Sequence, residues 1–133
     1  MTEHTTVGID IAKDTFDVFI SPDGLFLHLD NTPHGHQQLL DALASRIVVR
    51  IVMEATGRYH NLLAATLELA GLPVAVVNPA QVKHFARALG TLFKTDPNDA
   101  RIICEFGRRM TPAVRPAPDE QTQRLAIDRR AHV

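Results

Sequence analysis

The sequence predicts an α/β fold in which one mixed sheet is covered by helices on both faces. Residues 5–29 contain three apolar segments separated by short turns, the pattern of an antiparallel meander. Residues 34–77 then alternate helical periodicity with continuous apolar runs, the pattern of parallel strands. The chain has 133 residues, of which 45% are hydrophobic and 22% charged, so we expect one domain with its own core.

Three strands are expected to form the meander. The first, residues 5–12, has an alternating apolar pattern that Asp10 interrupts. Residues 15–20 and 25–29 predict the second and third strands. The segment between them, Ser21-Pro22-Asp23-Gly24, is composed of residues that favour a turn.

Helices and buried strands are expected to follow. We predict helices at 34–45 and 58–70, the second ended by Gly71. The apolar runs 47–53 and 73–77 predict strands covered on both faces.

Two further helices are predicted near the end of the chain, at residues 80–89 and 97–110. The second should turn four apolar side chains inward, namely Ile102, Ile103, Phe106 and Met110. Residues 111–118 are rich in proline and predict a linker, and residues 119–133 restart a helical pattern. This order of elements describes a ribonuclease H-like fold over residues 1–110, whose first strand carries a central Asp.

Composition restricts the class of protein. The lone Cys104 lies in an apolar stripe, where core packing is expected, and no disulfide framework is possible. The first residues lack the features of a signal peptide, and no apolar run reaches membrane-spanning length. A cytoplasmic protein with no membrane partner is therefore expected.

Charge is spread unevenly although the net charge is only −1. Residues 1–78 hold nine acids and four Lys or Arg, a net −5, whereas residues 79–133 hold six acids and ten Lys or Arg, a net +4. The basic part is suited to phosphates and the acidic part to metal. An ordinary solvated surface with chance asymmetry is the alternative.

Four carboxylates, Asp10, Glu54, Asp96 and Asp99, occupy positions where surface acids are not expected. Acids that converge from strands and a helix repel one another unless a cation lies between them. Hard cations such as Mg²⁺ or Mn²⁺ select oxygen ligands, and two ions about 3.5–4 Å apart form sites that cut and join phosphodiesters.

Each carboxylate also has a structural interpretation. Asp10 could face solvent, but Gly8 and Ala12 on the same strand face predict open space above it, suited to a metal and a DNA backbone. Glu54 ends a strand, at the edge where α/β sheets place ligand sites. Asp96 and Asp99 suit the N-cap and N3 positions of a helix, and capping and metal binding can coexist.

Other motifs are weaker. His34 and His36 lack a zinc-ligand spacing, so surface roles are expected for both. The tripeptide Gly8-Ile9-Asp10 is similar to the phosphate-binding hairpin of actin-like ATPases, but no glycine-rich phosphate loop accompanies it.

Five ordered motifs together resemble the RuvC-like domain of DEDD insertion-sequence transposases and Piv-type DNA invertases. The motifs are Gly8-Ile9-Asp10-Ile11-Ala12-Lys13-Asp14, Glu54-Ala55-Thr56-Gly57-Arg58-Tyr59-His60, Asn78-Pro79, Phe85-Ala86-Arg87-Ala88-Leu89-Gly90 and Lys94-Thr95-Asp96-Pro97-Asn98-Asp99-Ala100. The resemblance implies that Asp10, Glu54, Asp96 and Asp99 are the DEDD set, with Pro97 a small departure.

The resemblance also implies an activity: transposition or site-specific recombination by cleavage and strand transfer that depends on Mg²⁺ or Mn²⁺, with two ions. Four basic residues would hold the DNA backbone: Lys83, Arg87, Lys94 and Arg101. Such transposases carry a second domain with a nucleophilic serine after a coiled coil, so residues 119–133 are expected to begin that coiled coil and to self-associate.

This chain is expected to lack the serine domain and to be unable to complete strand exchange by itself. A structured guide RNA and a homo-oligomer are further partners that the resemblance suggests. Two alternatives remain: a non-catalytic nucleic-acid-binding or assembly module, and a RuvC-like junction resolvase.

Overall fold

The computed structural model describes residues 4–90 and 99–115. The elements are β1 (His4–Ile11), β2 (Thr15–Ser21), β3 (Leu25–Asp30), α1 (Pro33–Leu43), β4 (Ile47–Glu54), α2 (Asn61–Leu69), β5 (Val74–Val77), α3 (Pro79–Leu89) and α4 (Asp99–Met110). They follow the predicted order, with small shifts at their ends. The predicted helical segment 119–133 and the end of the predicted linker lie outside the described residues.

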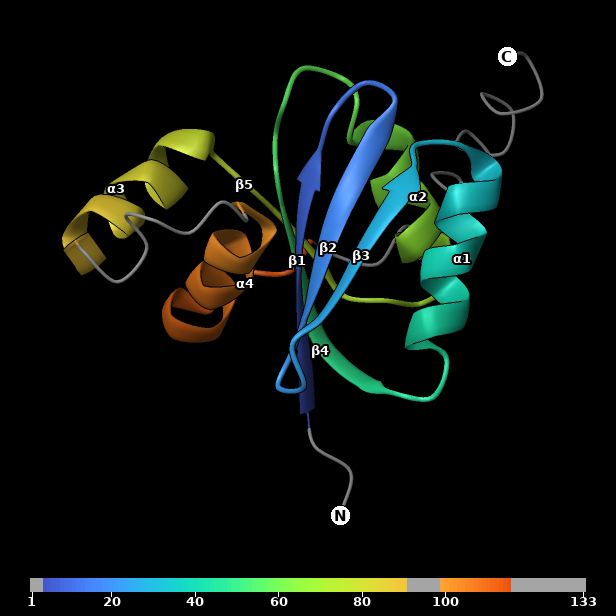
Figure 1. Ribbon diagram of the computed structural model, residues 1–133, viewed down its shortest axis with the longest axis horizontal. Coiled ribbons are helices and arrows are strands. Elements are labelled where there is room, and N and C mark those ends of the chain that lie inside the picture. Colours follow the sequence, from blue (N-terminus) through green and yellow to red (C-terminus); the bar gives the residue numbers. More distant parts are fainter. Residues whose placement is uncertain (1–3, 91–98, 116–133) are drawn as a thin grey trace.

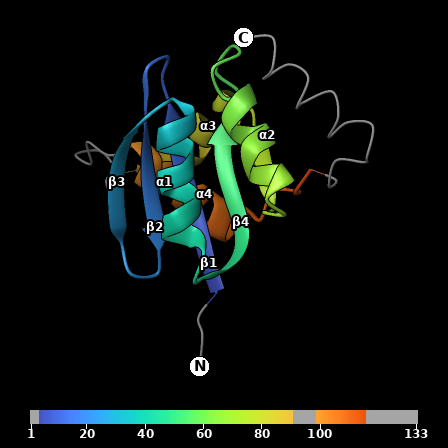
Figure 2. The ribbon, with the colours of Figure 1, turned by 90° about the vertical axis from the view of Figure 1, so that its right-hand side faces the viewer.

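The sheet is mixed, with the strand order β3-β2-β1-β4-β5. β1 pairs antiparallel with β2 and parallel with β4, while β3 and β5 form the two edges. Helices α1 and α2 cover one face and α3 and α4 the other (Figures 1 and 2). The predicted α/β architecture is confirmed, including the antiparallel meander and the parallel strands.

Alternation along the strands divides the core into two layers. The layer under α1 and α2 contains Val7, Ile9, Phe16, Val18, Leu39, Leu63 and Leu67. The layer under α3 and α4 contains Val52, Ala75, Val77, Val82, Ile103 and Phe106. Side chains two residues apart on a strand lie on the same face. Asp10 is two residues from Gly8, and Glu54 is two residues from Val52, both of which face α4. Asp10 and Glu54 therefore lie on the face of the sheet that carries the second layer.

Two predictions about burial were wrong. Met110 was expected to point inward, but it is 56% exposed, because it is the last residue of α4 and lies beyond the core. The run 47–53 was expected to be covered on both faces, yet Ile47 is 49% exposed and only Ile51, Val52 and Met53 are fully buried. Cys104 packs in the core as predicted, with its thiol directed at the Thr6 carbonyl.

The space above Gly8 is occupied, which corrects the expectation of an open strand face there. A Cβ atom at Gly8 would lie 2.3 Å from the Ala100 carbonyl oxygen and 2.3 Å from the Cys104 nitrogen. The absent side chain therefore allows the backbone of α4 to lie directly on β1. This close contact brings the first turn of α4, with Asp99, over the strand that carries Asp10.

Asn31, which follows β3, ties three loops together. Its Nδ2 donates to the carbonyl oxygens of Ala12, Lys13 and Tyr59 at 3.2, 3.4 and 3.2 Å. Its Oδ1 lies 2.8 Å from His36 Nε2. The expectation of a surface role for His36 was wrong, because the ring is buried against Phe16 and bonded to Asn31.

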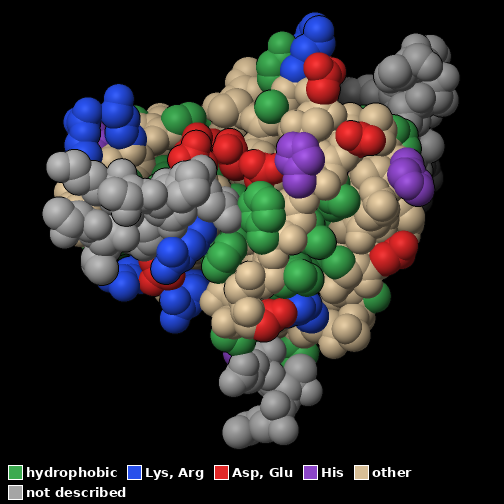
Figure 3. Space-filling model, viewed as in Figure 1, with side chains coloured by type: hydrophobic (Ala, Val, Ile, Leu, Met, Phe, Trp, Pro, Cys, Tyr) green, Lys and Arg blue, Asp and Glu red, His purple; other side chains and the backbone are tan. Residues whose placement is uncertain are grey.

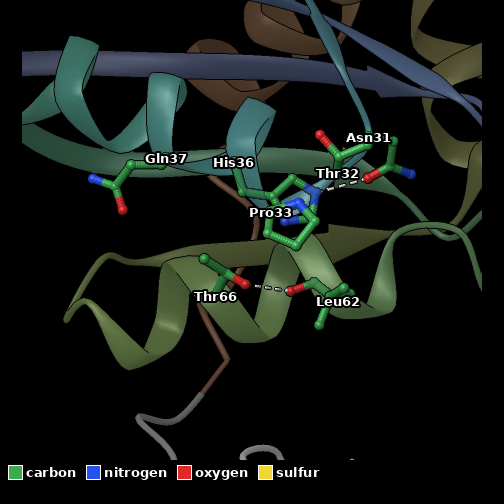
Figure 4. Close-up of a pocket in the computed structure, with 7 residues that line it drawn as sticks. All are labelled: Asn31, Thr32, Pro33, His36, Gln37, Leu62 and Thr66. Atoms are coloured by element: carbon green, nitrogen blue, oxygen red, sulfur yellow. Dashed lines mark hydrogen bonds between the residues drawn. The ribbon is translucent and has the colours of Figure 1, made fainter. Parts of the chain in front are cut away.

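A cavity of about 590 Å³ lies beside this junction, between α1 and α2. Figure 4 shows Asn31 and His36 on its inner side, with Leu62 and Thr66 of α2 opposite. The hydrogen bonds of Asn31 hold in place the loops that follow β1 and β4. These two strands carry Asp10 and Glu54.

Replacing Asn31 with alanine is expected to destabilise the fold. The substitution Asn31→Ala removes the acceptor of His36 and the donor of three carbonyl groups, so the free energy of unfolding should fall by about 2–3 kcal/mol. Urea unfolding measures the change. Gln37→Ala is the matched control, since this exposed neighbour only bonds Asp41 and should cost less than about 0.5 kcal/mol. Equal losses in the two variants would contradict the role of Asn31.

Candidate metal centre and nucleic-acid interface

Three of the four predicted acids converge on one cavity. Asp10 lies near the end of β1, Glu54 is the last residue of β4, and Asp99 is the first residue of α4. The parallel register pairs Ile9 with Met53, so Asp10 and Glu54 end adjacent strands at the same edge of the sheet. Together with Lys83 of α3 they line a cavity of about 290 Å³, hereafter the acid cavity.

The two strand acids are held in an environment that disfavours their charge. Partial burial, followed by the negative charges of Asp99 and Asp17, raises the pKa of Asp10. Burial also raises the pKa of Glu54, and the charges of Asp10 and Asp99 act in the same direction. Every charge that shifts these two carboxyls thus comes from another acid, so a bound cation would relieve the repulsion among them.

The donor set suits a hard divalent cation, although the acids are not drawn together at ligand distances. Within residues 4–90 and 99–115, no group of three or more His, Cys, Asp or Glu has the spacing of a complete metal site. Asp10, Glu54 and Asp99 nevertheless line one cavity, and the charge of Asp99 raises the pKa of both other acids, so the three carboxylates lie close enough to influence one another. Carboxylate oxygens are the ligands that Mg²⁺ and Mn²⁺ prefer.

The remaining predicted site residues are distributed around this cavity or fall outside the described part of the chain. Asp96 and Lys94 lie outside the described residues, so the capping role of Asp96 stays a prediction. Lys83 lines the acid cavity, whereas Arg87 on α3 and Arg101 on α4 are exposed and do not line it. Figure 3 shows Lys and Arg side chains over α3 and α4, beside a group of acidic side chains at the sheet.

Some residues of the site were not predicted to line it, although Pro79 and Ala86 belong to the motifs that carry the family resemblance. The wall formed by α3 consists of Pro79, Val82 and Ala86, next to Lys83. Their spacing of three and four residues was a signal that one helix face was involved. Asp17 was also missed: it pairs with Asp10 across β1 and β2, a relation that only strand register could supply.

Comparisons with known proteins give matches in both sequence and structure. The profile of a transposase family, that of the IS110-type DEDD transposases, matches residues 7–133. The pilin gene-inverting proteins of Moraxella bovis and Moraxella lacunata are each 28% identical over 130 residues. Those matches include 92% of this chain but 40% of each relative, so the chain spans less than half the length of these proteins.

A solved structure shares the fold. The structure of Thermus thermophilus RuvC in complex with a Holliday junction substrate superposes with a TM-score of 0.62 at 18% identity, over 85% of this chain and all of RuvC. The ribonuclease H-like prediction is therefore confirmed. No described helix combines the length and the apolar character needed to cross a membrane.

Proposed function

Because this chain belongs to the IS110-type DEDD transposase family, we propose that it is the catalytic domain of a DNA transposase or recombinase. The supporting observation is the acid cavity, in which Asp10, Glu54 and Asp99 meet beside Lys83. In this proposal Asp96 completes the acidic set, and the substrate is the DNA of the bacterial or archaeal chromosome or of a mobile element.

The acids would hold Mg²⁺ or Mn²⁺, as a pair of ions, through their carboxylate oxygens. Such ions polarise a phosphodiester and stabilise the leaving oxygen when they are bound. Asp10 and Glu54 are suited to this role because they come from the ends of two rigid adjacent strands, while Asp99 is held over them by the contact of α4 with Gly8. Lys83 would hold a phosphate at the mouth of the cavity.

A Mn²⁺ binding experiment tests the proposal directly. The electron paramagnetic resonance signal of free Mn²⁺ should fall when the chain is added, because bound ions lose that signal. Glu54→Gln should restore most of it, whereas the matched control Asp41→Asn, an exposed acid of α1, should not. An unchanged Mn²⁺ signal with the unsubstituted chain would contradict the metal centre.

Binding of DNA should depend on the basic helix α3. Lys83 and Arg87 are four residues apart on α3, and both are exposed. The double substitution Lys83→Glu with Arg87→Glu should weaken binding of all DNA sequences alike, by about tenfold or more at low salt, because phosphate contacts carry little sequence information. Fluorescence anisotropy of labelled oligonucleotides at several salt concentrations measures it.

The control for that prediction reverses charge on another face. Arg46 lies away from the acid cavity and forms an ion pair with Asp23. Arg46→Glu should therefore leave DNA affinity nearly unchanged. Salt-independent binding, or an equal loss in the Arg46 variant, would show that α3 does not contact the backbone.

In this proposal, strand exchange also needs a nucleophilic serine. The proposed nucleophilic serine belongs to a second domain, and Ser21 and Ser45 are the only serines in this sequence. Neither lines the acid cavity. Weak Mn²⁺-dependent nicking is therefore the activity that we expect from residues 1–133, and we propose a guide RNA and an oligomeric assembly as further partners in strand exchange.

A further inference from the structure

We propose that the face of β2 and β3 that the described helices leave uncovered, beside the acid cavity, binds unpaired bases of the DNA strand whose phosphate enters that cavity. This aromatic face consists of Phe19, Phe26 and His28. The inference rests on the proposed function, since it identifies where the strand runs after it leaves the acids.

The aromatic face exists because α4 covers only part of the sheet. Helix α4 packs against β1, β2 and β4. On β3, Leu27 and Leu29 pack toward the core, so Phe26 and His28 point to the opposite side, where α4 lies. Phe26 is 46% exposed, and the His28 side chain is 61% exposed. Figure 3 shows hydrophobic side chains gathered over β2 and β3, next to a histidine and the acidic group.

Strand register makes this face continuous with the acid cavity. Asp10 pairs with Asp17 on β2, and Asp17 pairs with His28 on β3, so these three side chains form a row across the sheet. Phe19 pairs with Phe26 in the next same-face row, two residues along each strand, about 7 Å away. A strand of a few nucleotides that starts at the acids would therefore cross the rings.

The chemistry of the face suits bases better than phosphates. Residues 15–30 contain no Lys or Arg, so nothing on these strands attracts a backbone. Aromatic rings stack on any base, because every base has a π-face. The hydrogen bond between His28 Nδ1 and Asp17 Oδ1 holds the imidazole on this face.

A second copy of the chain is a poorer occupant. Asp17 and Asp30 lie on or beside the same face, so two such faces would bring like charges together. Bases carry no charge and can lie on the rings while their phosphates remain near the cations of the cavity and of α3.

A tryptophan reporter tests the assignment. The chain has no tryptophan, so Phe26→Trp introduces a single indole on the aromatic face and Leu62→Trp introduces one on α2, which covers the opposite side of the sheet. A single-stranded oligodeoxynucleotide should quench the emission of the Phe26→Trp protein but not that of the Leu62→Trp protein. As long as the oligonucleotide is kept at saturation, raising the salt should leave the quenching of the bound Phe26→Trp protein unchanged, since stacking involves no counterion release.

Affinity gives the second readout. Phe26→Ala should weaken binding of single strands by about tenfold and leave duplex binding nearly unchanged, because duplex bases are already stacked. Leu62→Ala, a control at an exposed apolar residue of α2, should change neither.

The outcomes separate this inference from the proposed function. If the chain binds DNA through α3 but the emission of the Phe26→Trp protein and the affinity of the Phe26→Ala protein do not change, the aromatic face is not a base site and the proposed function stands. If no DNA binds at low salt, both fail. Emission of the Phe26→Trp protein that changes with protein concentration alone would assign the face to a second copy and overturn the inference.

Discussion

Millimolar Mn²⁺ should raise the melting temperature of this chain by about 5 °C or more, since a ligand at 100 times its Kd stabilises a fold by about 2.7 kcal/mol. The rise is expected because Asp10, Glu54 and Asp99 share one cavity, and because burial together with the negative charges of neighbouring acids raises the pKa of Asp10 and of Glu54. Asp10→Asn should abolish most of it. Differential scanning fluorimetry with and without Mn²⁺ measures both proteins.

The same substitution should stabilise the metal-free protein. The pKa of Asp10 is raised by burial and by Asp99 and Asp17, so the folded chain holds this proton more tightly than the unfolded chain. Stability therefore falls as the pH rises from the unfolded-state pKa through the raised value, and the whole penalty is present once the pH lies above that raised value. Asn removes the charge, so the melting temperature in a chelator should rise by about 2–5 °C.

A matched acid distinguishes a specific site from general attraction. Asp41→Asn removes an exposed charge of α1 and should keep the full response to Mn²⁺. If Mn²⁺ does not move the melting curve of the unsubstituted chain, or stabilises the Asp10→Asn protein equally, the acid cavity is not a metal centre.

Gly8→Ala should destabilise the fold by about 3 kcal/mol or more, the upper range for overpacking a core. The new Cβ would lie 2.3 Å from two backbone atoms of α4, and backbone inside a helix cannot move aside as a side chain can. The helix must lift from β1, which also moves Asp99 away from Asp10. Urea unfolding measures the loss of stability, and the Mn²⁺ melting shift should decrease with it.

Gly107 provides a comparison within the same interface. A Cβ there would lie 2.5 Å from a methyl group of Val52, which can rotate, and alanine favours a helix over glycine. Gly107→Ala should therefore cost about 1–2 kcal/mol, less than Gly8→Ala. A Gly8→Ala protein as stable as the parent would mean that α4 does not rest on this residue.

Local signals in the sequence were sufficient for most of the fold. Alternation identified the meander, and helical spacing identified the helices. Gly71 was recognised as a helix stop, and its φ of 84° is the left-handed conformation that glycine adopts readily. These features are decided by neighbours within a few residues, so the sequence alone carries them.

The acids of the site were also recognisable, for a different reason. Asp10 and Glu54 interrupt or end apolar runs, and chain order places the ends of parallel strands at one edge of the sheet. The placement of both on the face toward α4 follows from counting alternate residues. Their convergence with Asp99 needed the position of a helix that no local pattern specifies.

The environments of several residues could be decided only by tertiary contacts. Gly8 could mark open space or a close approach, because the absence of Cβ is the same in both cases, and only the docking of α4 selected the second. His36 became a core residue because Asn31 lies within reach of its ring nitrogen. Phe19 and Phe26 became neighbours of the acids through register across β2 and β3, since a strand's own pattern defines its two faces but not what covers them.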